Sequence, residues 1–148
     1  AKARHASKET GKPAIADDSG LCVPALGGAP GIISARYARV GATDTENVNL
    51  LLSELEAFDE EDRYACFHSV IVLLTHFEHP FPNIFEGVWE GEILTKPQGD
   101  KGFGYDPVFY VPTQECSAAE LDLELKNEIS HRGQAMQDFL VFMKEVMA

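Results

Sequence analysis

Three short segments of the sequence combine residue types that can bind or activate a phosphorylated ligand. The first, Asp17-Asp18-Ser19-Gly20, follows residues 13–16, a short apolar run that predicts a buried strand. Ligand clefts of α/β proteins form where strands end, and a carboxylate placed there can ligate Mg²⁺ and orient or deprotonate a water. Because side chains alternate along an extended chain, we expect only one of the two aspartates to face the cleft. An Asx turn that merely ends the strand explains the same residues and stays open as an alternative.

The second segment is the glycine-rich run of residues 99–107, which contains Gly102-Phe103-Gly104-Tyr105-Asp106. Glycines let the backbone approach a ligand closely, and Phe103 between two of them has no local packing partner. Stacking of an aromatic ring on a base contributes about 1–3 kcal/mol in single-stranded nucleic-acid complexes. This pattern favours a base-binding loop with Tyr105 and Asp106 as polar contacts. The alternative is a tight, hairpin-like loop whose Phe103 is buried in the core.

The third segment is Ser130-His131-Arg132-Gly133. If Ser130 caps the last helix, His131 and Arg132 occupy its first turn, where the helix dipole disfavours cations. A local conflict of this kind often marks a functional site. The donors of the two side chains suit an acceptor such as a purine 6-oxo oxygen or a phosphate. An exposed basic pair that offsets an acidic surface is the alternative.

The elements that must position these segments include several strands. Residues 64–75 are almost continuously apolar and rich in Val and Ile, which predicts a central strand covered on both faces. Residues 84–94 predict a second strand in which Gly87 and Gly91 allow bending, and residues 107–111 predict a further short one.

Helices are expected between and beside these strands. Residues 1–8 favour a helix, and residues 44–58 have apolar positions at helical spacing after the capping box of Thr43 and Glu46. Ser117 and Glu120 form a second capping-box pattern. The core side of the last helix is expected to comprise Met136, Phe139, Leu140, Met143 and Met147. Helices interleaved with strands predict an α/β fold with a mixed sheet.

The composition limits the classes of function. The net charge of −12, from twelve Lys and Arg against twenty-four Asp and Glu, disfavours a duplex nucleic-acid partner. A phosphorylated ligand remains possible if a divalent cation offsets the carboxylates that face it. The longest apolar run, residues 70–74, is too short to span a membrane. Three cysteines without a C-x-x-C pair indicate reduced thiols in a cytoplasmic protein.

The length of 148 residues corresponds to one domain. The sequence has no starting methionine and no cap ahead of its first helix, so we expect an N-terminal segment to be missing from this single domain, residues 1–148.

Together these segments resemble the inosine triphosphate pyrophosphatase family, and the match runs in register over essentially the whole chain. The matching motifs are Ala16-Asp17-Asp18-Ser19-Gly20-Leu21, Leu26-Gly27-Gly28-Ala29-Pro30-Gly31, Ser34-Ala35-Arg36-Tyr37-Ala38, Gly102-Phe103-Gly104-Tyr105-Asp106-Pro107, Ala118-Ala119-Glu120-Leu121 and Ser130-His131-Arg132-Gly133.

The resemblance implies an α/β fold with a long mixed sheet flanked by helices and a substrate cleft between two lobes, usually in a homodimer. It implies Mg²⁺-dependent hydrolysis of ITP, dITP or XTP to the monophosphate and pyrophosphate by attack of water on the α-phosphorus. Carried over by motif, Asp18 is the general base and magnesium ligand. The other implied residues contact the substrate. Phe103, Gly104, Tyr105 and Asp106 hold the base and sugar, and His131 and Arg132 contact the 6-oxo group. Ser19, next to Asp18, and Lys126 are implied as further substrate contacts.

One departure bears on activity. Family members open with a strand and a Thr-Gly-Asn-x-x-Lys segment that holds the triphosphate, and this sequence lacks it, so we expect weakened or lost activity in the chain as it stands. The alternatives to the enzyme are a nucleotide-binding protein that no longer catalyses, a pyrophosphatase for other modified nucleotides, and a plain interaction module.

Overall fold

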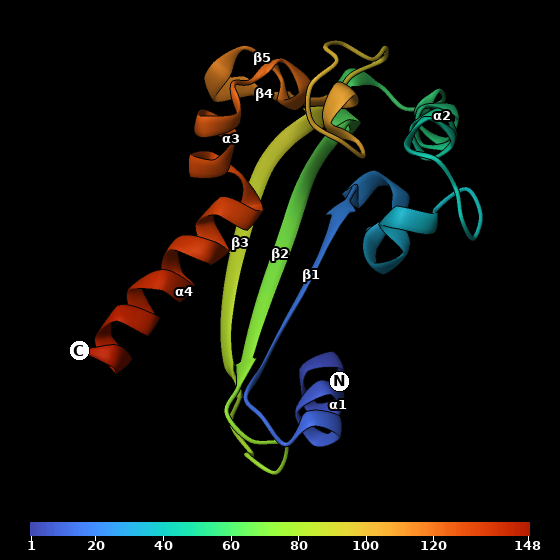
Figure 1. The fold of residues 1–148 in the computed structure, drawn as a ribbon. Helices are drawn as coiled ribbons and strands as arrows, with labels where there is room; N and C mark the ends of the chain where they lie inside the picture. The colour runs from blue at the N-terminus through green and yellow to red at the C-terminus, as the bar shows by residue number, and fades with distance from the viewer.

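The computed structural model describes residues 1–148 and is built on one five-stranded sheet (Figure 1). Three long strands lie side by side, and two short ones continue the sheet at one end. In sheet order they are β1 (Ala14–Cys22), β2 (Tyr64–Leu74), β3 (Asn83–Ile93), β4 (Phe109–Val111) and β5 (Cys116–Ser117). The predicted strands over residues 64–75 and 84–94 are confirmed, and β2 has the expected central position between β1 and β3.

The expected α/β fold with a long sheet flanked by helices is confirmed, but every pairing within the sheet is antiparallel rather than mixed. The connection from β1 to β2 explains this for the first pair of strands. It stays at the end of the sheet where β1 finishes, so Cys66 near the start of β2 pairs with Cys22 at the end of β1. A parallel pairing requires the connection to cross back along the sheet.

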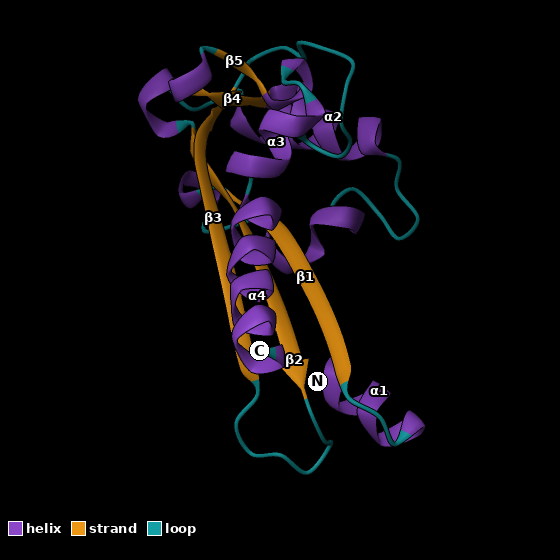
Figure 2. Ribbon diagram, turned by 60° about the vertical axis from the view of Figure 1, so that its left-hand side comes forward, coloured by secondary structure: helices purple, strands orange, loops and turns teal.

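Four α-helices and six short 3₁₀ turns complete the chain. The helices are α1 (Lys2–Thr10), α2 (Asp44–Leu55), α3 (Leu123–Ile129) and α4 (His131–Met147). The 3₁₀ turns are η1 (Pro24–Leu26), η2 (Gly31–Arg36), η3 (Glu60–Asp62), η4 (Asp106–Val108), η5 (Pro112–Gln114) and η6 (Ala118–Glu120). In Figures 1 and 2, α4 runs along one face of the sheet. Helix α1 lies beside the start of β1, at the opposite end of the sheet from α2. None of these helices combines the length and apolar character needed to cross a membrane.

Both predicted capping boxes are present. The Thr43 hydroxyl oxygen accepts a hydrogen bond from the Glu46 backbone N–H, and the Glu46 carboxylate accepts one from the Thr43 backbone N–H, which fixes the start of α2. Ser117 and Glu120 form the same reciprocal pair, although the element that follows is the 3₁₀ turn η6 and not an α-helix.

The segment Asp17-Asp18-Ser19-Gly20 lies inside β1 and is not a turn after a short strand. The register pairs Asp17 with Ile71 and Gly20 with His68, so β2 continues to hydrogen-bond this part of the chain. Turn-forming residue types are overridden here by pairing with a long apolar neighbour. The Asx-turn alternative is therefore contradicted.

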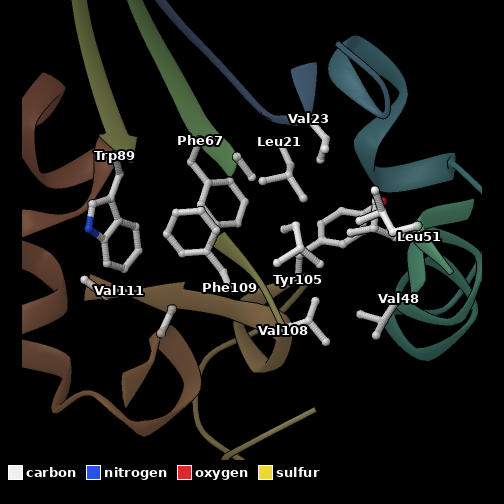
Figure 3. Close-up of a cluster of buried hydrophobic side chains, with 14 of the residues drawn as sticks. Leu21, Val23, Val48, Leu51, Phe67, Trp89, Tyr105, Val108, Phe109 and Val111 are labelled. Carbon is white, nitrogen blue, oxygen red and sulfur yellow. The ribbon is translucent and has the colours of Figure 1, made fainter. Parts of the chain in front are cut away.

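The main core lies where the upper end of the sheet meets α2 and the β4 region (Figure 3). Leu21, Phe67 and Trp89 come from β1, β2 and β3 at positions that are opposite one another across the sheet. Phe109 packs against both aromatic rings, with centroids 4.6 Å from Phe67 and 5.1 Å from Trp89. This cluster is the rigid base beneath the cavity described below.

Sheet coverage differs from the expectation in two places. One face of β2 is buried, whereas the other is only partly covered and exposes His68. On α4, Met136, Leu140 and Met147 are exposed instead of facing the core. The helix packs on the sheet through Gly133 and Ala135 near its start, and farther along through Phe139 and Phe142, which are partly buried and contact Phe85. Met143 is also partly buried.

Candidate functional site

A cavity of about 470 Å³ lies between the sheet with the start of α4 on one side and η2, α2 and the glycine-rich loop on the other. This volume is in the range of small-molecule sites. It is lined by Asp17, Asp18, Ser19, Gly20, Leu21, Ser34, Ala35, Asp44, Asn47, Phe67, Phe103, Gly104, Tyr105, Asp106, Leu123, Lys126, Asn127, Ser130, His131 and Arg132. Every site residue expected from the sequence is in this set. The expected cleft between two lobes is therefore present.

The β1 side of the cavity is open and carries the two aspartates. Their side chains are 66% exposed for Asp17 and 69% for Asp18. Asp18 Oδ2 lies 3.3 Å from Lys2 Nζ, and Asp17 Oδ2 lies 3.9 Å from an Arg132 guanidinium nitrogen. The same guanidinium donates to Ser19 Oγ at 3.3 Å. Both carboxylates border the cavity, so the expectation that only one of them faces it is wrong. Their different cationic neighbours still reflect the alternation of side chains along a strand.

The glycine-rich loop is held from within by Asp106. Its carboxylate accepts a hydrogen bond from the Phe103 backbone N–H at 3.0 Å and forms an ion pair with Lys126. Both partners of this pair are nearly buried, with side-chain exposures of 5% for Asp106 and 11% for Lys126. Gly102 has a φ of +72°, in the left-handed region, and a Cβ there would overlap Asp106 Oδ2. Only glycine fits this position.

Phe103 is presented to the cavity and is not buried in the core, which contradicts the alternative of a plain hairpin-like loop. The residue is 59% exposed. Lys126 Nζ lies 4.5 Å from its ring centroid, and the guanidinium carbon of Arg132 lies 5.5 Å away. Two cations at one aromatic ring attract an electron-rich ligand to the same place.

Two hydrogen bonds fix the loop to the neighbouring elements. The Tyr105 hydroxyl donates to the Ser34 carbonyl at 2.7 Å, and the Gly104 N–H donates to Asp44 Oδ2 at 2.8 Å. Burial, followed by Tyr37 and Asp44, raises the pKa of Tyr105 above its usual value, so the phenol stays protonated and keeps donating. The loop is thus held in place before any ligand arrives.

His131 forms the buried end of the cavity. Ser130 caps α4 as predicted, since its Oγ accepts from the Gly133 N–H at 3.1 Å. The imidazole stacks on Phe67 with centroids 4.7 Å apart and planes 11° apart. Its Nδ1 is buried and has no hydrogen-bond partner within the chain.

The electrostatic environment keeps this imidazole neutral. Burial lowers the pKa of His131 to about 4, and the charges of Arg132 and Lys126 and the nearby His68 add to the effect. A neutral imidazole has one N–H donor and one acceptor nitrogen. A neutral His131 also carries no charge for the helix dipole to disfavour, so Arg132 is the one cation in the first turn of α4.

Sequence reasoning missed several residues that line the cavity. Phe67 resembles any other core residue of a central strand, and only its stacking on His131 reveals its role. Asp44 and Asn47 belong to an ordinary amphipathic helix, in which Asp44 is also a favourable residue for the first turn. Their connection to the cavity depends on contacts with segments far away in the sequence.

Asp17 and Asp18 at the open end, and Asp44 across from them, are the exposed carboxylates in the cavity lining. No group of three or more His, Cys, Asp or Glu side chains in the chain is arranged to hold a metal ion. Mg²⁺ in nucleotide-processing sites is usually held by one or two carboxylates together with water and substrate phosphates. Two exposed carboxylates beside a cavity of nucleotide size fit that coordination.

Comparison with known proteins identifies the relatives of this chain. The profile described as the Ham1 family matches residues 1–142. A dITP/XTP pyrophosphatase of Coxiella burnetii is 55% identical over 144 residues, which are 97% of this chain and 72% of that protein. The dITP/XTP pyrophosphatase of Photobacterium profundum is 54% identical over 97% of this chain and 73% of its own length.

Solved structures of Ham1 proteins have the same fold as this chain. A HAM1 protein from Coxiella burnetii superposes with a TM-score of 0.94 at 55% identity and covers 97% of this chain and 73% of its own. The Ham1 protein of Staphylococcus aureus gives a TM-score of 0.91 at 42% identity, with the same coverage of 97% and 73%.

Proposed function

The chain belongs to the Ham1 family, and from this premise we propose how its cavity performs the reaction that its relatives are named for. The chain is a hydrolase of non-standard purine nucleoside triphosphates, dITP and XTP among them, and forms the monophosphate and pyrophosphate. The observation that carries this function is the identity of about 55% to dITP/XTP pyrophosphatases over 97% of the chain. The resemblance to the inosine triphosphate pyrophosphatase family implies the same reaction.

The buried end of the cavity is proposed to bind the base. His131 is neutral and lines the cavity, so one ring N–H can be offered to a 6-oxo oxygen. Hypoxanthine and xanthine present this acceptor, whereas adenine presents an amino donor that leaves a buried donor unpaired, at a cost of about 1–3 kcal/mol. Arg132 supplies further donors, and the exposed ring of Phe103 is placed to stack on the base.

The loop residues are proposed to fix the orientation of base and sugar. Gly104 and Tyr105 are tied to Asp44 and Ser34, so their backbone meets the ligand already in place. Asp106 holds the ammonium of Lys126 close to the Phe103 ring, from where Lys126 contacts the substrate. Little side-chain entropy remains to be lost on binding.

The open end is proposed to carry out the hydrolysis. Asp18 accepts the proton of the attacking water and orients it toward the α-phosphorus, while Ser19 contacts the substrate beside it. The leaving group is pyrophosphate, so the bond that breaks joins the α-phosphorus to the bridging oxygen of the β-phosphate. The exposure of Asp18 supports this role, because a water and a triphosphate both need access to it.

Magnesium is the proposed cofactor. Asp18 would hold it, and the neighbouring Asp17 is a further carboxylate of the cavity wall. When bound, the ion supplies positive charge that offsets the phosphate oxygens beside an acidic chain. The assembly and location proposed with it are a homodimer and the cytoplasm, as the family resemblance implies. Light scattering of the purified chain measures the first of these.

The test is pyrophosphate release from ITP, dITP and XTP against ATP and GTP, with magnesium and with a chelator, combined with the thermal shift that each nucleotide produces. Release that is at least tenfold faster from ITP than from ATP supports the proposal. A thermal shift by ITP without release favours the nucleotide-binding protein that no longer catalyses. Neither release nor a shift at saturating ITP and magnesium contradicts the proposed function.

A further inference from the structure

Two cysteines lie directly opposite each other on neighbouring strands. Cys22 ends β1 and is the register partner of Cys66 in β2. Directly opposed residues of an antiparallel pair have Cα atoms about 4.5–5.5 Å apart and side chains on the same face. A disulfide spans Cα separations of about 4.4–6.8 Å. The Cα spacing of these two free thiols is therefore within the disulfide range. Their Cβ atoms, about 4.5–5.5 Å apart in such a pair against about 3.5–4.5 Å in a disulfide, need only a small local approach.

A histidine completes this pair. His68 is two residues beyond Cys66 on β2 and so shares its face, and its Nε2 lies 3.1 Å from Cys66 Sγ. Cys66 is buried, whereas Cys22 is half-buried and within reach of solvent. Burial raises the pKa of the Cys66 thiol, and Cys22 and Glu90 raise it further. Cys22 is thus the thiol that an external reagent reaches first, and the buried Cys66 is the thiol that resolves its adduct.

We propose that Cys22 and Cys66 form a reversible thiol-modification site, which closes into an intramolecular disulfide when the chain meets a low-molecular-weight disulfide. This inference is independent of the proposed hydrolase activity, because it uses neither the cavity nor a nucleotide.

The chemistry balances in two exchange steps. The Cys22 thiolate attacks one sulfur of the small disulfide, forms a mixed disulfide and releases the first small thiolate. Cys66 then passes its proton to His68 Nε2, and its thiolate attacks the Cys22 sulfur and expels the second small thiolate. The protein loses two thiol hydrogens and becomes oxidised, and the small disulfide is reduced to two thiols.

The bond would act on the segment that forms the upper wall of the cavity. The chain between Cys22 and Cys66 carries η2 and α2, which supply Ser34 and Asp44 to the lining. Leu21 and Phe67, each the immediate neighbour of one cysteine, also line the cavity from the other face of the sheet. Closing a loop of this length restricts the unfolded chain, so oxidation is expected to raise the thermal midpoint by roughly 4–10 °C.

The experiment incubates the full chain with oxidised glutathione, blocks remaining thiols by alkylation and maps the digest by mass spectrometry without reduction. The expected product is a Cys22–Cys66 linked peptide, two hydrogens lighter than its parts, with Cys116 alkylated. Cys116 lies on β5, three interstrand steps of about 4.8 Å from β2, and serves as the internal control. Dithiothreitol should restore both thiols, Cys116→Ser should still form the link, and Cys22→Ser should not.

Several results would overturn the proposal: alkylation of both Cys22 and Cys66, a glutathione adduct that stays on Cys22, or a link to Cys116 or to a second chain. Protection that is removed by a chelator and not by dithiothreitol would instead indicate a thiophilic metal on the two cysteines and His68. The variant His68→Gln tests the proton acceptor. It should slow closure several-fold and accumulate the Cys22 adduct, and an unchanged closure rate would remove His68 from the mechanism.

Discussion

The two ends of the cavity are built in opposite ways. At the buried end, His131, Lys126 and Asp106 are held by stacking, a buried ion pair and a helix cap. At the open end, Asp17 and Asp18 are exposed on opposite faces of β1, each with one exposed cation near it. The buried end therefore has its geometry and its protonation state fixed before a ligand binds. At the open end, the exposed carboxylates are accessible to water, a metal ion and the phosphates of a ligand.

This difference has a physical lesson for recognition and chemistry. Selecting a base requires donors whose loss of a hydrogen bond to the wrong partner costs much binding free energy. That cost is large only where water cannot replace the missing partner. Hydrolysis of a triphosphate requires access for water and tolerance of a large change in charge, which an exposed carboxylate provides. Substitutions at the two ends should accordingly fail in different ways.

The largest effect is expected at the open end. Replacing the proposed general base, Asp18→Asn, should lower kcat by about 10²–10⁴-fold because a positioned base contributes that much to proton transfer. The matched variant is Asp17→Asn, which removes the neighbouring carboxylate and should cost less. Pyrophosphate release measures both, and circular dichroism checks that both fold. If Asp17→Asn is the more damaging of the two, the roles of the aspartates are exchanged.

The next effect concerns the stability of the buried end. Asp106→Asn leaves the Lys126 ammonium buried without its partner, and breaking a buried pair in this way costs about 3–5 kcal/mol. The contrasting variant is Lys2→Ala, which removes the exposed pair with Asp18 and should cost at most about 1 kcal/mol. Urea denaturation followed by circular dichroism measures the free energies of unfolding. Equal losses in the two variants would contradict the distinction between the two ends.

The pH dependence of stability is a further property of the buried end. The folded pKa of His131, about 4, is below the unfolded value of 6.5, so between these values the unfolded chain binds a proton that the folded chain does not. Its contribution is fully present above about pH 6.5 and is lost as the pH falls toward 4, by at most about 3 kcal/mol. Denaturation midpoints between pH 7 and 4 should fall less steeply in His131→Gln than in the unsubstituted chain. Parallel slopes would show that the imidazole does not titrate as described.

The smallest expected effect separates base selection from catalysis. His131→Phe keeps a ring to stack on Phe67 but removes the donor, and it should reduce the preference for ITP over ATP in kcat/KM by about 5–150-fold. His131→Gln keeps an N–H donor and should retain more of the preference. Competition assays with the two nucleotides measure the ratio. A preference that survives in the Phe variant would assign base reading to Arg132 or to the loop.

Local patterns were sufficient for much of this molecule. The capping boxes at Thr43 and Ser117 and the Ser130 cap link residues three positions apart, so the chain forms them wherever it lies. The near-continuous apolar run of β2 predicted a central strand, because this pattern too is read from neighbouring residues alone. The motifs also named the residues that gather at one cavity, because their chemical types and order along the chain carry the family resemblance.

The tertiary structure decided what depends on distant partners. Whether Asp17 and Asp18 form a turn or a strand was decided by pairing with β2, and which side of α4 is exposed was decided by how that helix packs on the sheet. The neutrality of His131 comes from Phe67 and the burial around it, more than sixty residues away in sequence. Burial, and with it the protonation state, is a property of the assembled fold, since no residue's own type or immediate neighbours fix the dielectric around it.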